Sequence, residues 1–265
     1  MSLEFKPLNM DPKILSERIS QEILAHVNPV ALIDHDGATF DLIQRWLGHQ
    51  TVELSGRVEI IHPIKESTCS FNPLTWISEV DFADPAIAVR DAFRSILSMS
   101  PKASGIWNAQ SESILIDTLM LLVASKASLE QLPRVLLDDD FCAALMTDVQ
   151  SRLASRVTFA AILVKWAQWK RLRRTDQWNI WVAPVIQSIN PQLFERRSRN
   201  LLPDDEPNFH PVVSIKKKTT LLVKLPYSEF GEAATLMSTL ILANLNLASS
   251  FQSQEKEPMI FIVAQ

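Results

Sequence analysis

Residues 165–199 combine positive charge with tryptophan, a pattern that suits nucleic-acid binding. This stretch holds eight Lys or Arg residues and only two acids, so its net charge is +6 while the rest of the chain carries −10. Cations of this kind meet phosphates while bases stack on indole rings. The alternative is a helix with a tryptophan-lined inner face and a solvated basic outer face, because Trp166, Trp169 and Leu172 share helical spacing. Four tryptophans lie among the cations, which are Lys165, Lys170, Arg171, Arg173, Arg174, Arg196, Arg197 and Arg199.

A second polar cluster, Asp34, His35 and Asp36, follows a short apolar run and ends at Gly37. The carboxyl ends of parallel strands are where α/β sheets bind ligands, so a metal or ligand role is one interpretation. The other interpretation is a structural turn that only shapes the chain.

The remaining polar groups indicate no catalytic centre. Residues 138–140 are three aspartates before a predicted helix, where an N-cap and negative charge are stabilising, and Ser228 is expected to cap the last long helix. Cys69 and Cys142 have no neighbours at metal-ligand spacing, so we expect reduced thiols and neither a metal nor a cofactor. No pairing of a nucleophile with a histidine base emerges from the spacing.

The elements that position the Asp34 cluster alternate between helix and strand. Apolar side chains recur at helical spacing over residues 12–27. Asp11 supplies an N-cap for this helix and Pro12 a first-turn proline. Residues 29–33 form a continuous apolar run, which is typical of a buried parallel strand. A helix over residues 40–47 and a strand over residues 57–61 follow. This order predicts an α/β fold with a parallel sheet.

The basic region lies in a different kind of segment. From residue 85 to about residue 200 the periodicity is almost entirely helical. Strand character returns at residues 219–225 and 259–263, on either side of a long helix over residues 228–251. We therefore predict the first part of an α/β core at residues 1–84, an all-helical insertion at 85–205 and the second part of the core at 206–265.

Three short motifs follow one another along the chain in an informative order. Residues 34–37 read Asp-His-Asp-Gly, residues 71–74 read Phe-Asn-Pro-Leu, and residues 231–234 read Gly-Glu-Ala-Ala. This order resembles the type IV secretion coupling proteins and conjugative-transfer ATPases, within the FtsK/HerA class of DNA translocases. The resemblance implies a partial RecA-like (P-loop NTPase-like) sheet with a helical insertion. The positions that match the family motifs are Asp34, Gly37, Asn72, Pro73, Gly231 and Glu232.

The groups that would bind and hydrolyse ATP in that family are missing. Its phosphate loop falls at about residues 5–14 here, yet no glycine precedes Gly37 and none of the five glycines is followed by lysine. Such glycines let backbone N–H groups surround the phosphates. The family's acidic pair, which holds magnesium and positions the attacking water, corresponds to Ala264 and Gln265.

We therefore expect a non-catalytic, degenerate relative of the translocases that acts through protein or DNA contacts in a conjugation or DNA-processing assembly. One alternative is a piece of a split ATPase that receives its missing residues from a partner chain. A second alternative is an interaction module unrelated to translocases, with a coincidental α/β pattern.

Composition agrees with a soluble protein. Apolar residues make up 47% and charged residues 21%, and the net charge of −4 gives no overall attraction to nucleic acid or anionic lipid. No signal peptide is evident, and no apolar run reaches the length of about 18 residues that a membrane span requires. We expect a cytoplasmic protein with a protein partner or a second copy of itself, DNA contacts confined to the basic stretch, and no integral membrane segment.

Overall fold

The computed structural model describes residues 10–50, 54, 56–63, 70–79, 85–99, 108–153, 157–193, 209–251 and 260–264. The chain divides into two compact units. Unit 1 is Met1–Phe71 with Pro207–Gln265, and unit 2 is Asn72–Glu206. The first boundary therefore comes after Phe71, whereas the sequence predicts it after residue 84. The Asn72 side chain donates a hydrogen bond to the Ala127 carbonyl oxygen (3.4 Å), which ties this segment to the helical unit.

Unit 1 contains a four-stranded parallel sheet in the order β2-β3-β1-β4. The strands are β1 (Val30–Asp34), β2 (Val58–Ile61), β3 (Thr220–Lys224) and β4 (Ile260–Ala264). β1 pairs with both β3 and β4, and all five of its residues are buried, which explains its continuous apolar sequence. The chain thus has the α/β architecture that the sequence predicts, and the strands do belong to one sheet.

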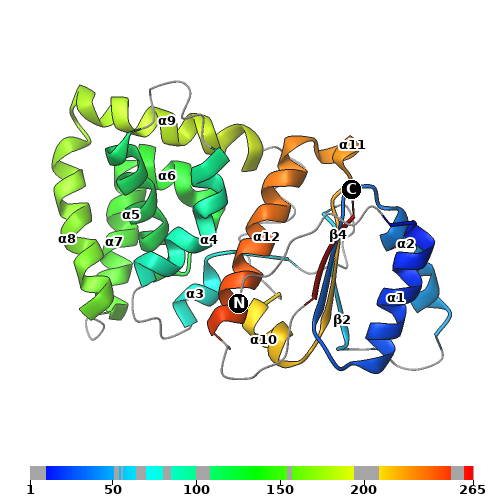
Figure 1. The fold of residues 1–265 in the computed structure, drawn as a ribbon. Helices are drawn as coiled ribbons and strands as arrows, with labels where there is room; N and C mark the ends of the chain where they lie inside the picture. The colour runs from blue at the N-terminus through cyan, green and yellow to red at the C-terminus, as the bar shows by residue number, and fades with distance from the viewer. Residues whose placement is uncertain are drawn as a thin grey trace. The chain divides into compact units, whose positions relative to one another are not determined.

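Helices cover both faces of this sheet. α1 (Pro12–Ala25) and α2 (Ala38–Gly48) lie on one face, and α10 (Pro211–Lys216) and α12 (Glu232–Phe251) lie on the other (Figure 1). A short helix, α11 (Tyr227–Phe230), precedes α12. On the first face, an apolar core joins α1 and α2 to the sheet through Leu15, Ile19, Ile23, Val30, Leu32, Phe40, Ile43 and Leu222.

α12 is long and apolar enough to cross a membrane by length and composition alone, and it is the one such helix among the described residues. Its window Ala233–Ser250 is 56% buried within the protein. The buried side chain of Asn244 donates a hydrogen bond to the Leu240 carbonyl oxygen (2.8 Å), and the buried Ser238 hydroxyl donates to the Ala234 carbonyl oxygen (2.7 Å). This burial is compatible with the core helix of a soluble protein.

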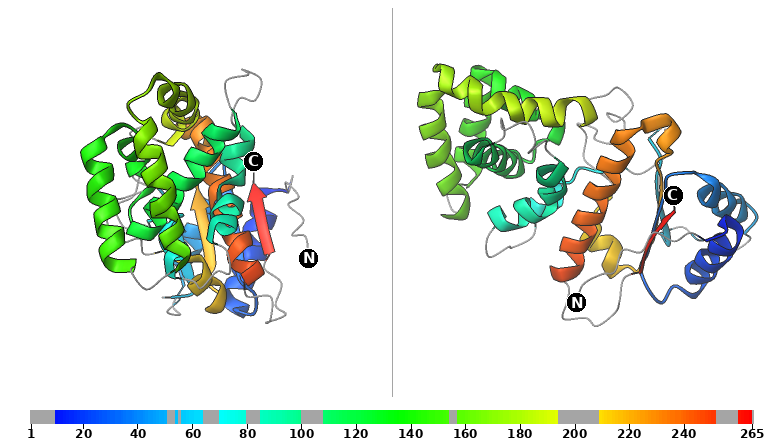
Figure 2. Two further views of the ribbon diagram at one scale, coloured as in Figure 1. Left: turned by 90° about the vertical axis from the view of Figure 1, so that its left-hand side faces the viewer. Right: turned by 45° about the horizontal axis from the view of Figure 1, so that its top comes forward.

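Unit 2 is built from helices around α5 (Ala109–Ser125), which is buried along most of its length. Figure 2 shows α5 enclosed by its neighbours, and it contacts α4, α6, α7, α8 and α9. The surrounding elements are α3 (Thr75–Glu79), α4 (Pro85–Met99), the 3-10 helix η2 (Leu129–Gln131), α6 (Leu132–Leu137), α7 (Asp139–Leu153), α8 (Val157–Leu172) and α9 (Asp176–Leu193).

The helix-capping predictions have mixed outcomes. Asp11 caps α1 through a bond from the Lys13 amide (2.8 Å), and Asp138 accepts from the Phe141 amide at the start of α7 (2.9 Å), as expected. The prediction for Ser228 is wrong. It lies inside α11, Gly231 with φ +53° separates this short helix from the next, and α12 begins only at Glu232.

Candidate functional site

The chain leaves the carboxyl ends of β1 and β3 toward opposite faces of the sheet. After β1 it enters α2 and goes on to β2, which lies beyond β3. After β3 it enters α12 on the other face and goes on to β4, which lies beyond β1. Ligands of α/β sheets bind outside the carboxyl ends of the strands at such a reversal. Residues 34–37 and 224–227 therefore form the candidate site, which we call the strand-end site.

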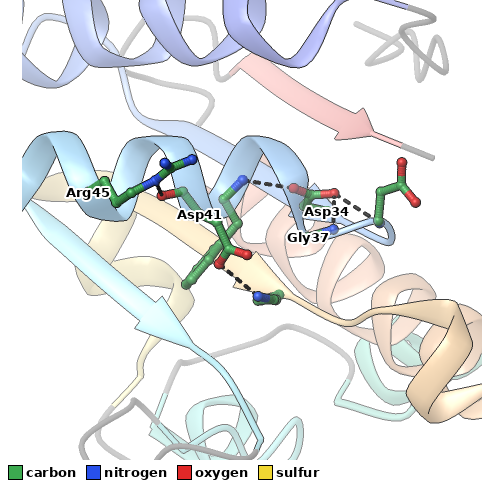
Figure 3. Close-up of polar contacts among 7 residues, drawn as sticks. Asp34, Gly37, Asp41 and Arg45 are labelled. Carbon is green, nitrogen blue, oxygen red and sulfur yellow. Dashed lines mark hydrogen bonds and ion pairs between the residues drawn. The ribbon is translucent and has the colours of Figure 1, made fainter.

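Asp34 uses its carboxylate to hold the turn between β1 and α2. One oxygen accepts from the backbone amides of Asp36 (3.0 Å) and Gly37 (2.8 Å), and the other accepts from the Phe40 amide (2.8 Å). Figure 3 shows Asp34 directed at the start of α2 beside Gly37. The Asp34 side chain is fully buried. The start of a helix attracts anions through its free amides, and here the chain's own carboxylate fills that position.

Lys224, opposite Asp34 in the sheet register, reaches across the same turn. Its ammonium group lies 2.7 Å from a carboxylate oxygen of Asp41, on α2 (Figure 3), and its side chain is only 17% exposed. The Cε atom of Lys224 lies 2.7 Å from where a Cβ on Gly37 would stand, and Gly37 has φ +84°. The left-handed backbone favours glycine here, whereas the flexible Lys224 side chain could move to admit a Cβ.

His35 points to the opposite face of the sheet, toward α12. Its Nε2 lies 2.6 Å from the Ser238 hydroxyl, which in turn lies 2.7 Å from the Ala234 carbonyl oxygen. The Ser238 hydroxyl has one hydrogen, which it donates to the Ala234 carbonyl oxygen. Its oxygen then accepts a hydrogen bond from the Nε2–H of His35. Burial lowers the pKa of His35, and the nearby Asp34 partly opposes this shift. Burial therefore favours the neutral imidazole over the charged one.

The two loops of the strand-end site are also bonded to each other. The Leu225 amide donates to the Asp34 carbonyl oxygen (3.0 Å), and the Tyr227 amide donates to the His35 carbonyl oxygen (2.8 Å). The carboxylate, ammonium and imidazole of the site thus all bond to groups of the protein itself. Across the described part of the chain, no group of three His, Cys, Asp or Glu side chains is placed to hold a metal ion. This geometry favours the structural-turn interpretation of residues 34–37.

In unit 2, part of the basic region serves internal packing. Asp117 on α5 is 3% exposed. Its carboxylate accepts from the Lys165 ammonium (3.0 Å) and from the Trp169 indole (2.9 Å), and its backbone carbonyl accepts from the Trp166 indole (2.9 Å). These three bonds fix α8 against α5. Three of the predicted nucleic-acid contacts therefore bond to one buried residue, Asp117.

Arg173 is also an internal residue, with its side chain 4% exposed. Its guanidinium bonds to Asp139 (2.7 Å) and to the Val135 carbonyl oxygen (2.9 Å), and it lies over the Trp178 ring. Burial raises the pKa of the adjacent Cys142 thiol, an effect that Arg173 partly offsets. Cys142 is a free, buried cysteine.

The tryptophans pack on one another. Trp166 and Trp178 are buried, at 0% and 3% exposure, and Trp169 contacts Trp178 and Trp181 with ring centroids 6.3 and 6.2 Å apart. Trp166 and Trp178 therefore offer no surface for stacking bases, and Trp169 and Trp181 are half-buried. α8 therefore has the tryptophan-lined inner face that its helical spacing predicts.

Four predicted cations are exposed: Lys165, whose side chain is 55% exposed, Lys170 and Arg171 near the end of α8, and Arg174 just after it. The other predicted cations lie outside the described residues; these are Arg196, Arg197 and Arg199.

The remaining motif positions are structural in character. The Asn72 side chain is buried and accepts from the Leu74 amide (3.0 Å), which shapes the turn at the buried Pro73 before α3. Gly231 takes a positive φ between α11 and α12, and Glu232 is the first residue of α12.

Sequence reasoning missed two of the most informative residues. Lys224 is a lone charge at the end of an apolar strand, and Asp117 is a lone charge in the apolar stretch of α5. Isolated charges in buried segments are costly unless they are paired, so each was a detectable sign of an internal partner.

Comparison with known proteins places the chain in no family: no protein-family model, no curated protein and no solved structure matches it.

Proposed function

We propose that this chain is a non-catalytic, degenerate relative of the coupling proteins and DNA translocases, built on a partial RecA-like sheet. In this proposal it works in the cytoplasm, through protein or DNA contacts, in a conjugation, type IV secretion or related DNA-processing assembly. The order of the motifs at residues 34–37, 71–74 and 231–234 supports the relationship. The missing phosphate loop and acidic pair support the loss of catalysis.

The observation that carries the proposal is the self-contained strand-end site. A nucleotide-binding site presents free amides and free cations to phosphate. Here the Asp34 carboxylate occupies the amides at the start of α2, and Lys224 is paired with Asp41. Neither group is offered to a ligand, which fits a scaffold whose function lies in surface contacts.

The test uses the full chain with Mg²⁺–ATP, ADP and a non-hydrolysable ATP analogue. We expect no nucleotide-dependent rise in Tm by scanning fluorimetry, no heat of binding by calorimetry and no phosphate release. A nucleotide that raises Tm, or that is ordered against residues 5–14 in a crystal, would refute the loss of catalysis.

Gene neighbourhood provides an independent check. We expect adjacent genes to encode DNA-transfer or DNA-processing proteins. A neighbour with an intact Gly-Lys-Ser/Thr loop, whose product restores ATP hydrolysis on mixing, would instead support a split ATPase.

A further inference from the structure

The chain passes from unit 1 to unit 2 after Phe71 and returns before Pro207. The unit 1 residues beside these two crossings are bonded to each other. The amide of Phe209, the first described residue after the return crossing, donates a hydrogen bond to the Ser70 carbonyl oxygen (3.1 Å). The rings of Phe71 and Phe209 meet edge to face, with their centroids 5.5 Å apart. We call Ser70, Phe71 and Phe209 the clasp.

The clasp is fixed in the interior of unit 1. Phe71 and Phe209 are 0% and 3% exposed. Directly after Phe209, the His210 side chain caps α10. α10 is in turn bonded to β2, because its Ser214 hydroxyl donates to the Glu59 carboxylate. Buried rings in close contact hold one another in place, so the outgoing and the returning chain are both held at one place on unit 1.

The residue that follows the clasp is anchored in unit 2. The Asn72 side chain donates to the Ala127 carbonyl oxygen (3.4 Å) and accepts from the Leu74 amide (3.0 Å). Pro73 restricts the backbone of the residue before it to extended conformations. Leu74 and Trp76 are then buried, at 0% and 1% exposure, and α3 contacts α5. The chain is therefore part of unit 2 from Asn72 onward.

A single peptide bond thus separates a residue fixed in unit 1 from a residue fixed in unit 2. The torsions on either side of that bond are ψ of Phe71 and φ of Asn72. Rotation about either torsion leaves the clasp and the Asn72 anchor intact, because each side chain stays with its own unit. Protein hinges are a few residues of this kind, which absorb changes in φ and ψ. Since the clasp also holds the returning chain, both connections share one pivot on unit 1.

We infer that the peptide bond between Phe71 and Asn72 is a hinge about which the helical unit turns relative to the α/β unit. Relative motion is the default for domains of one chain unless a large apolar interface joins them. The clasp limits this motion to the hinge, because it keeps the two connections from separating. The inference concerns the motion of the two units and does not depend on the proposed function.

The experiment measures distances within and between the units by pulsed electron paramagnetic resonance on the full chain. Cys69 and Cys142 are changed to serine, and spin labels are placed at exposed glutamines. Q21C with Q177C reports on the distance between the units, and Q110C with Q177C reports on unit 2 alone. We expect the between-unit distance distribution to be at least about twice as wide as the one within unit 2. Equal widths would refute the hinge.

Two variants test where the hinge lies. F209L removes the contact between the two rings of the clasp, and N72D removes the N–H that bonds to Ala127. Each variant frees the chain on one side of the hinge, so each should widen the between-unit distribution further and leave the distribution within unit 2 unchanged. F40L is the matched control, because Phe40 is an equally buried phenylalanine of unit 1 that lies on α2. It should leave both distributions unchanged.

N72D keeps the inference open to refutation if F209L fails to fold, since it retains the side-chain oxygen that accepts from the Leu74 amide. The inference fails if neither F209L nor N72D widens the between-unit distribution. It also fails if F40L widens that distribution as much as F209L does, because the effect would then reflect a general loosening of unit 1. None of these measurements involves a nucleotide, so this inference and the proposed function fail separately.

Discussion

Arg173 and Arg174 are adjacent in sequence, yet they belong to different parts of the molecule. Arg173 is enclosed by Asp139, the Val135 carbonyl oxygen and the Trp178 ring, whereas Arg174 is exposed. Charge density along the sequence treats the two as equal, because it carries no information on which side of the helix end each lies. Burial separates an arginine that stabilises unit 2 from one that is free to meet a partner.

We predict that R173A lowers the free energy of unfolding by about 2–3 kcal/mol, because it removes a buried ion pair, a hydrogen bond and packing against Trp178. R174A, the matched control, should change it by less than about 0.5 kcal/mol. Urea denaturation followed by tryptophan fluorescence measures both, since six of the seven tryptophans have sequence positions within unit 2. Equal effects of the two substitutions would contradict the internal role of Arg173.

At the scale of elements, the apolar strands and the long periodic helices were predictable, and two of the shortest helices were not. The apolar run of β1 and the helices on either side of it are correct because burial imposes the pattern directly. α3 and α10, with five and six residues, were missed because so few residues show no period. The role of Asp34 needed the structure, since a strand-end carboxylate suits a ligand and a turn equally well. The internal bonds of Lys165 and Trp169 could not be predicted, because their partner Asp117 lies about fifty residues away in the chain.

The start of α2 provides the element-scale prediction. D34A removes the acceptor for three backbone amides, two of them in buried hydrogen bonds, and should lower the free energy of unfolding by about 3 kcal/mol. D36A removes an exposed carboxylate from the same turn and should have little effect. Circular dichroism in increasing urea measures the difference. A D34A protein as stable as D36A would show that Asp34 does not hold the turn.

At the scale of the whole molecule, two half-buried titratable groups, His35 and Glu59, make stability depend on pH in opposite directions. Burial lowers the pKa of His35 from its ordinary value of 6.5, so the unfolded chain takes up this proton more readily. The contribution of His35 to the free energy of unfolding is therefore present above pH 6.5. It is lost as the pH falls through the pKa of His35 in the folded protein. Burial raises the pKa of Glu59 from 4.5, with the hydrogen bond from Ser214 partly opposing the shift. Its contribution is present at low pH and is lost as the pH rises through the folded pKa.

We predict that H35Q flattens the fall in Tm between about pH 6.5 and pH 5, because the group that takes up the proton on unfolding is gone. H49Q, at an exposed histidine of the same unit, should keep the slope of the wild-type chain. Scanning fluorimetry across this pH range measures both variants. If H35Q and wild type keep parallel curves, His35 is not the group responsible.

The arrangement of strands in unit 1 has a consequence for synthesis on the ribosome. β1 and β2 come early in the chain, but they do not pair with each other. β3, which follows the helical insertion in sequence, lies between them in the sheet. The first two strands therefore have no native hydrogen-bonding neighbour until Thr220–Lys224 has emerged. The insertion, which is a compact unit of its own, has the opportunity to form first, and the early strands must be kept from aggregating during that time.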